Sequence, residues 1–176
     1  MNKAVFLDRD GVLSVEKGYV CCPEDLEIFP YSRDCISSIH KKGYLAIVIT
    51  NQSGIARGLF EERTLQAMND KLIEKTGVDG VYYCPHHPQG VVAGYSYICE
   101  CRKPRTGMIE KACRDLEISL EGSYMVGDRA SDIMLGIRAG IKTVLLESGY
   151  GIARLEEQVT PDFIFPDLRG FVDFLE

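Results

Sequence analysis

Short, unbroken apolar segments recur along the chain and alternate with stretches that have helical periodicity. The clearest apolar segments are residues 3–7, 44–49 and 142–146, and residues 78–83 and 123–126 are weaker members of the series. Strands without polar residues at alternate positions are typical of a parallel sheet that is covered on both faces. The alternation therefore predicts an α/β fold with a doubly wound parallel sheet sandwiched by helices.

The intervening segments carry apolar residues at helical spacing. The four stripes are Cys35, Ile36 and Ile39; Leu65, Met68, Leu72 and Ile73; Met108, Ile109, Ala112, Cys113 and Leu116; and Ile133, Ile137 and Ala139. Glycine follows three of the stripes, at positions 43, 77 and 140, where it can end a helix. Thr106 is a candidate cap at the start of another. Residues 162–165 and 168–174 are expected to add a last edge strand and helix.

Two segments interrupt this alternation, residues 16–30 and residues 84–104. Loops of such length inside a compact domain are usually functional or disordered. A chain of 176 residues suits one domain with a sizeable core, and its sequence contains no repeat or linker-like composition. We therefore expect residues 1–176 to form a single domain.

Charge and hydropathy exclude several classes of protein. The net charge of −6 argues against a protein that chiefly binds nucleic acid, which needs a basic face. Apolar runs stay well short of the roughly 20 residues of a membrane-spanning helix. The chain reaches Asp8 and Asp10 before any stretch that resembles a signal peptide. We expect a cytoplasmic monomer that acts on a small molecule and binds neither membranes nor nucleic acid.

Cysteine and histidine gather in the second interrupting segment. The pattern C-x-H, twelve residues, C-x-C offers Cys84, His86, Cys99 and Cys101 as four ligands, the number that a closed tetrahedral Zn²⁺ site takes. His87 could compete, but spacing of two residues favours His86 beside Cys84. The alternative is a group of free cytosolic thiols. A zinc ion here would stabilise the loop and fix the residues that follow it.

Four polar motifs fall at or after the ends of the predicted strands. They are DRDG (residues 8–11), TNQS (50–53), RKP (102–104) and GDRASD (127–132). Ligands of open α/β sheets bind at the carboxyl ends of the strands, so these motifs are candidates for one site. The alternative is that the acidic residues only cap helices or strands and that Lys103 is a surface lysine.

In this order, the four motifs resemble the haloacid dehalogenase superfamily of phosphohydrolases, over residues 8–132. The resemblance implies a Rossmann-like fold in which Asp8 attacks phosphorus and forms an aspartyl-phosphate. Asp10 would act as general acid and base, and Thr50 and Lys103 would bind the transferring phosphoryl group.

The same resemblance implies a Mg²⁺ ion. It would be held by the Asp8 carboxylate, the Asp10 main-chain carbonyl and Asp128, because oxygen is the preferred ligand of this hard cation. Asp132 would orient the site from outside the ligand set. A phospho-acceptor signalling domain is a different class of α/β protein, but it phosphorylates an aspartate on a later strand.

The sequences CPHHP (84–88) and CECRKP (99–104), with GYV (18–20) and TNQSGIARG (50–58), are similar to two related families. These are the bacterial D-glycero-D-manno-heptose 1,7-bisphosphate 7-phosphatases and the histidinol-phosphatase domains. The first implies removal of the 7-phosphate in nucleotide-activated heptose synthesis for surface glycans such as lipopolysaccharide. The second implies hydrolysis of histidinol phosphate.

The sequence has no cap domain, because neither of the two positions where members of the superfamily carry one holds a segment long enough. Loops would then line the substrate pocket, and the resemblance implies as binding residues Glu16, Lys17, Gly18, Tyr19, Asn51, Gln52, Ser53, Arg102 and Arg129. Arg102 and Arg129 would grip a second phosphate, which favours the bisphosphate, and Arg57 is a weaker candidate. The anomer of the sugar stays open.

Overall fold

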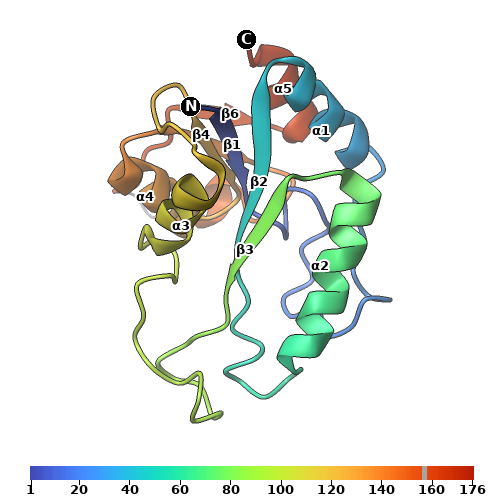
Figure 1. The fold of residues 1–176 in the computed structure, drawn as a ribbon, viewed down its shortest axis with the longest axis vertical. Helices are drawn as coiled ribbons and strands as arrows, with labels where there is room; N and C mark the ends of the chain where they lie inside the picture. The colour runs from blue at the N-terminus through green and yellow to red at the C-terminus, as the bar shows by residue number, and fades with distance from the viewer. Residues whose placement is uncertain (156–157) are drawn as a thin grey trace.

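The computed structural model describes residues 1–155 and 158–176, which form a parallel sheet with helices on both faces (Figure 1). The sheet has the order β3-β2-β1-β4-β5-β6, and neighbouring strands are parallel. The strands are β1 (Lys3–Leu7), β2 (Tyr44–Asn51), β3 (Gly80–Cys84), β4 (Tyr124–Gly127), β5 (Lys142–Leu146) and β6 (Phe163–Phe165). The predicted doubly wound α/β fold is confirmed.

Successive residues of a strand point to opposite faces, and helices cover both faces. On the face that carries Val5 and Leu7 lie α1 (Ser32–Lys41), α2 (Glu62–Thr76) and α5 (Leu168–Phe174). On the face that carries Ala4 and Phe6 lie α3 (Gly107–Leu116) and α4 (Ala130–Ala139). A short 3₁₀-helix, η1 (Ile152–Arg154), follows β5. None of the helices in the described residues is long and apolar enough to cross a membrane.

Some strand ends differ from the expected ones. β2 continues through Thr50 and Asn51, because these residues still pair with Tyr83 and Cys84 of β3. β3 begins at Gly80 rather than at residue 78, and β4 is displaced by one residue, to 124–127. Thr50 is therefore held within the sheet instead of following it.

Two expectations about the helices were wrong. Thr106 precedes α3 but does not cap it, because its hydroxyl donates to the Glu110 carboxylate instead of accepting from the main chain. Ile73 and Ile137 belong to the predicted apolar stripes, but their side chains are 40% and 55% exposed. The buried face of each helix is therefore narrower than the apolar pattern suggested.

The strand order positions the site. The chain runs outward from β1 to β2 and β3, then returns to β4 on the other side of β1, which creates a crevice at the carboxyl ends of the strands. Asp8 follows β1, Thr50 lies near the end of β2, and Asp128 follows β4. Residues far apart in the sequence thus converge at one end of the sheet.

Two loops, the one after β3 and the one between β2 and α2, reach the same end. In Figure 1 the loop after β3 extends well beyond the sheet, next to the loop that joins β2 to α2. The main-chain N–H groups of Val91 and Val92 donate to the Ala56 carbonyl at 2.7 and 3.0 Å, so the two loops are hydrogen-bonded to each other. They form one wall above the strand ends.

Candidate active site

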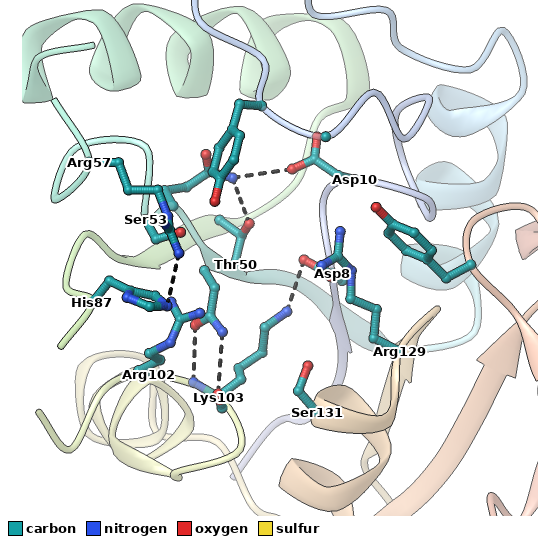
Figure 2. A pocket seen from close by; sticks show the side chains of 15 residues that line it. Asp8, Asp10, Thr50, Ser53, Arg57, His87, Arg102, Lys103, Arg129 and Ser131 are labelled. Atoms are coloured by element: carbon teal, nitrogen blue, oxygen red, sulfur yellow. Dashed lines mark hydrogen bonds and ion pairs between the residues drawn. The ribbon is translucent and has the colours of Figure 1, made fainter. Parts of the chain in front are cut away.

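A pocket of about 290 Å³ lies at the carboxyl ends of β1 and β2 (Figure 2). Its walls are formed by Asp8, Asp10, Gly18, Tyr19, Thr50, Asn51, Gln52, Ser53, Arg57, His87, Arg102, Lys103, Arg129, Ser131 and Tyr150. All four sequence motifs contribute to this one cavity. Most of the residues expected to act on or bind a ligand are therefore brought together.

Two expected binding residues do not line the pocket. Lys17 is not among the residues that line the pocket and forms an ion pair with Glu27 at 2.9 Å. The Glu16 carboxylate accepts from Arg129 Nη2 at 2.8 Å and from the Gly18 N–H at 2.6 Å. Glu16 thus holds an arginine of the wall instead of facing the cavity itself.

Sequence reasoning missed other wall residues. Ser131 lies inside the GDRASD motif but was not singled out, and Tyr150 lies in a glycine-flanked turn after β5. The sequence signal for Tyr150 is this turn, because ligands of such sheets bind where turns follow buried strands. His87 was considered only as a zinc ligand, and Arg57 only as a weaker candidate. Both now face the cavity.

Asp8 is a buried carboxylate of the pocket that is held through one of its oxygens. Its Oδ1 accepts from the Arg9 N–H at 2.7 Å and lies 2.9 Å from Lys103 Nζ, so both contacts go to one oxygen. Burial raises the pKa of Asp8 to about 6, partly opposed by the Lys103 charge. The second oxygen is available to a ligand in the pocket.

Lys103 is almost fully buried and fixed from several sides. Its Nζ lies 2.7 Å from Asp132 Oδ1 and donates to the Ile49 carbonyl at 3.0 Å. The Asn51 side chain accepts from the Lys103 N–H at 3.0 Å and so fixes its main chain. Burial opposes the charged form, but Asp132 and Asp8 hold the pKa of Lys103 above its ordinary value. The pocket therefore contains a fixed positive charge.

Gln52 connects the other two polar residues. Its Nε2 donates to Thr50 Oγ1 at 2.9 Å and to Asp10 Oδ2 at 3.2 Å. Because Thr50 Oγ1 accepts this bond, its own O–H is free to donate to a ligand. Figure 2 shows Thr50, Asp8 and Asp10 around the middle of the cavity.

Three buried carboxylates, those of Asp8, Asp128 and Asp132, offer oxygens within 4.8 Å of one another. Asp128 Oδ2 accepts from the Tyr150 N–H at 2.9 Å, whereas Oδ1 is buried without a hydrogen-bond partner in the described residues. Burial and the Asp8 charge raise the pKa of Asp128 to about 8. A hard divalent cation would satisfy the free oxygen and relieve this repulsion, so the donor set fits Mg²⁺.

Asp132 is engaged differently from the other two carboxylates. Its Oδ2 accepts from the main-chain N–H groups of Asp128 and Arg129 at 3.2 and 3.1 Å, and its Oδ1 faces Lys103. These contacts hold the turn between β4 and α4. Such contacts are expected of a residue that orients the site from outside the set of metal ligands.

Cys84, His86, Cys99 and Cys101 form a second cluster beside the pocket, with donor atoms within 4.8 Å of one another. The three sulfurs lie 3.1 to 3.5 Å apart and His86 Nδ1 lies 3.3 Å from Cys101 Sγ. The cysteines form no disulfide. The predicted four residues are thus adjacent, and His86 rather than His87 completes the set.

Ionisation and orientation in this cluster suit a soft metal. The hydrogen bond between the Cys84 and Cys101 sulfurs lowers the pKa of Cys101 to about 5, while the pKa of Cys84 is raised. The other ring nitrogen of His86, Nε2, lies 2.6 Å from the Tyr97 hydroxyl, which fixes the ring with Nδ1 toward the sulfurs. Three cysteine thiolates and one histidine are a typical set of Zn²⁺ ligands.

Three side chains that carry hydrogen-bond donors, Arg57, His87 and Arg102, gather on the wall formed by the two loops. The Gln89 N–H donates to His87 Nδ1 at 3.1 Å, so the proton of the neutral ring lies on Nε2. That nitrogen lies 3.3 Å from Arg57 Nη2, with Arg102 on the same wall. Burial and both arginines lower the pKa of His87. An oxyanion in the pocket could accept hydrogen bonds from this group of donors.

Comparison with known proteins decides the family. The HAD-hydrolase-like family model matches residues 100–171. A Haemophilus ducreyi protein named D-glycero-beta-D-manno-heptose-1,7-bisphosphate 7-phosphatase is 41% identical over 181 aligned positions, covering 99% of this chain and 98% of the relative. The chain belongs to this phosphatase family.

Further members of the family agree. The Escherichia coli (strain K12) protein of the same name is 38% identical over 164 positions, with 90% of this chain and 83% of the relative covered. A crystal structure of D,D-heptose 1.7-bisphosphate phosphatase from B. bronchiseptica, complexed with magnesium and phosphate, matches with a TM-score of 0.82 and 33% identity. The match covers 98% of this chain and 97% of that one. The predicted resemblance to the haloacid dehalogenase superfamily is confirmed.

Proposed function

We propose that the protein hydrolyses the 7-phosphate of D-glycero-β-D-manno-heptose 1,7-bisphosphate, the reaction for which its relatives are named. The observation that carries this proposal is the donor wall of Arg57, His87 and Arg102, which faces the same pocket as Asp8. A substrate with a second phosphate would supply an oxyanion that these donors can bind. Histidinol phosphate is not favoured, because its ammonium and imidazole groups would face two guanidinium groups.

The biological setting is part of the same proposal. Removing the 7-phosphate leaves the anomeric 1-phosphate for nucleotide activation, so the product would enter heptose synthesis for surface glycans such as lipopolysaccharide. We place the enzyme in the cytoplasm, where nucleotide sugars are made, and assign it a monomeric state. The whole chain would act as one domain.

In the first half of the reaction, Asp8 attacks phosphorus and the bond between phosphorus and the substrate oxygen breaks. Asp10 gives its proton to the departing alkoxide, which leaves as the alcohol. The Thr50 hydroxyl and Lys103 ammonium stabilise the charge on the phosphoryl oxygens. The product is an aspartyl-phosphate on Asp8, so one difficult step becomes two easier ones.

In the second half, Asp10 takes a proton from a water molecule whose oxygen attacks the same phosphorus. The bond between Asp8 and phosphorus breaks, which releases inorganic phosphate and restores both carboxyl groups to their starting states. Mg²⁺ would be held by Asp8, the Asp10 carbonyl and Asp128. There it would offset the repulsion between the Asp8 carboxylate and the phosphate dianion. Asp132 and Lys103 keep this set of oxygens oriented.

Zinc is proposed for the cluster of Cys84, His86, Cys99 and Cys101. The loop after β3 has little apolar core of its own, so a metal would contribute the free energy that holds it. Arg102 and Lys103 follow Cys101 directly, and both line the pocket. The zinc site would therefore hold two substrate-facing cations in place without touching the substrate.

Substituting Gly149 by alanine is expected to weaken Mg²⁺ binding by about tenfold or more. A Cβ atom at position 149 would lie 2.1 Å from Asp128 Oδ2, so the carboxylate would have to move. The Mg²⁺ concentration for half-maximal activity measures the effect. Gly94→Ala is the control, because its Cβ would meet nothing within 4 Å. An unchanged Mg²⁺ requirement in Gly149→Ala would contradict the assigned position of the cation.

Phosphate release from a panel of substrates tests the function. The panel contains the α and β anomers of heptose 1,7-bisphosphate, heptose 7-phosphate and histidinol phosphate, each with Mg²⁺. We expect the β-bisphosphate to exceed histidinol phosphate in kcat/KM by about 100-fold, or about 3 kcal/mol. Faster hydrolysis of histidinol phosphate would overturn the substrate assignment.

Arg57→Met should lower kcat/KM for the bisphosphate by about tenfold more than for heptose 7-phosphate, since only the bisphosphate reaches the donor wall. The control is Arg63→Met, because Arg63 is an exposed arginine that pairs with Glu61 outside the pocket. An equal loss for both substrates would show that Arg57 does not distinguish the second phosphate.

A further inference from the structure

We infer that Arg9 is a positioning residue that fixes the Asp10 carboxylate for proton transfer. This inference rests on the proposed phosphatase function. Arg9 does not line the pocket and is only 1% exposed, so it does not meet substrate itself. Its influence on the reaction would pass through Asp10.

The Arg9 guanidinium grips Asp10 with two nitrogens. Nε lies 3.1 Å from each carboxylate oxygen, and Nη2 donates to Oδ2 at 2.9 Å. A planar guanidinium matched to a carboxylate in this way fixes direction as well as distance. Ser14 Oγ donates to Oδ1 at 3.1 Å and Gln52 Nε2 to Oδ2 at 3.2 Å, so the carboxylate is held from three sides.

The side chain of Arg9 is dedicated to this one partner. Its remaining nitrogen, Nη1, is buried without a hydrogen-bond partner in the described residues. All the side-chain hydrogen bonds that Arg9 makes therefore go to Asp10. A general structural crosslink would connect several elements, whereas this one serves a single carboxylate.

Stability alone gives little reason for a buried arginine here. Removing a guanidinium from water is costly, and well-packed apolar residues of similar volume often stabilise a core as well as a buried ion pair does. Arg9 also places both reactive carboxylates, because its main-chain N–H donates to Asp8 Oδ1 while its side chain holds Asp10. One residue thus sets the positions of the nucleophile and of the proton donor.

The test compares two phases of p-nitrophenyl phosphate hydrolysis with Mg²⁺. Its leaving group is acidic and needs no proton, so the initial burst of p-nitrophenolate reports attack by Asp8. The slower steady phase reports hydrolysis of the aspartyl-phosphate, for which Asp10 must take a proton from water. We expect Arg9→Lys and Arg9→Met to slow the steady phase by about tenfold or more and to leave the burst rate within about threefold.

A double-mutant cycle with Asp10→Asn separates positioning from structure. If Arg9 acts through Asp10, adding Arg9→Lys or Arg9→Met to Asp10→Asn should change the steady rate less than about twofold. Arg9→Lys keeps a buried charge and is used if Arg9→Met fails to fold. Additive losses, an equally slowed burst, or failure of both variants to fold would overturn the inference. Absence of any burst or turnover in the unmodified enzyme would instead overturn the proposed function, and the inference with it.

Discussion

Asp8→Asn is expected to lower phosphatase turnover by about 10⁴-fold or more while the protein stays folded. The amide is nearly the same size as the carboxylate, but its oxygen is a poor nucleophile. Asp8 is buried beside Lys103 at 2.9 Å, so the substitution removes one attractive contact. It also removes repulsion from Asp128 and Asp132, and the unfolding midpoint should shift by only about 5 °C or less.

Turnover of the β-bisphosphate and a thermal unfolding curve measure the two parts of this expectation. Asp70→Asn is the control, since Asp70 is an exposed aspartate on α2 that accepts a hydrogen bond from Gln66. Full activity in Asp8→Asn would exclude Asp8 as the nucleophile. Loss of the folded state would show that the carboxylate is mainly structural.

Cys99→Ser is expected to reduce bound zinc from about one ion per chain to almost none, since four ligands would become three. Losing the metal should destabilise the loop after β3 by about 3 kcal/mol, or about 10 °C in the unfolding midpoint of a chain this size. Activity should fall through both a raised KM and a lowered kcat, because Arg102 and Lys103 follow the zinc ligands directly. The phosphoryl-transfer residues Asp8 and Asp10 are not part of this loop.

Elemental analysis of the purified variant gives the zinc content, and Cys113→Ser is its matched control. Cys113 is a partly buried cysteine on α3 that lies outside the cluster. Stoichiometric zinc in Cys99→Ser would exclude the four-ligand site. Loss of zinc in Cys113→Ser as well would point to a general loss of structure rather than to the removal of a ligand.

Much of the fold followed from local pattern. β1 and β5 span the residues that their apolar runs predicted, because every side chain of a doubly covered strand can be apolar. The ends of β2 and β3 were less predictable. Thr50 and Asn51 are polar, yet they extend β2 because Tyr83 and Cys84 pair with them. Such pairing joins distant segments, and the sequence of one strand does not reveal it.

The two groups of metal ligands also differ in how far they could be predicted from the sequence. The spacing of Cys84, His86, Cys99 and Cys101 confines four ligands to one loop, so their proximity could be predicted. The strand-end positions of the motifs predicted one shared site, but only the family resemblance assigned Asp8 and Asp128 to a metal ion and Asp132 to its surroundings. Asp8 follows β1, Asp128 follows β4 and Asp132 lies on α4, so the pairing of β1 with β4 brings them within reach of one ion.

By itself the sequence determined the fold class, the family and the residue types that carry the chemistry, since these depend on periodicity and on short motifs. Only the tertiary structure decided which cations are available to a substrate. Arg129 is held by Glu16, and Lys17 by Glu27, whereas Arg57 and Arg102 face the pocket without a carboxylate partner in the described hydrogen bonds. The physical reason is that an ion pair depends on distance in space, which depends on how a loop folds for Lys17 and Glu27 and on how two distant segments meet for Glu16 and Arg129.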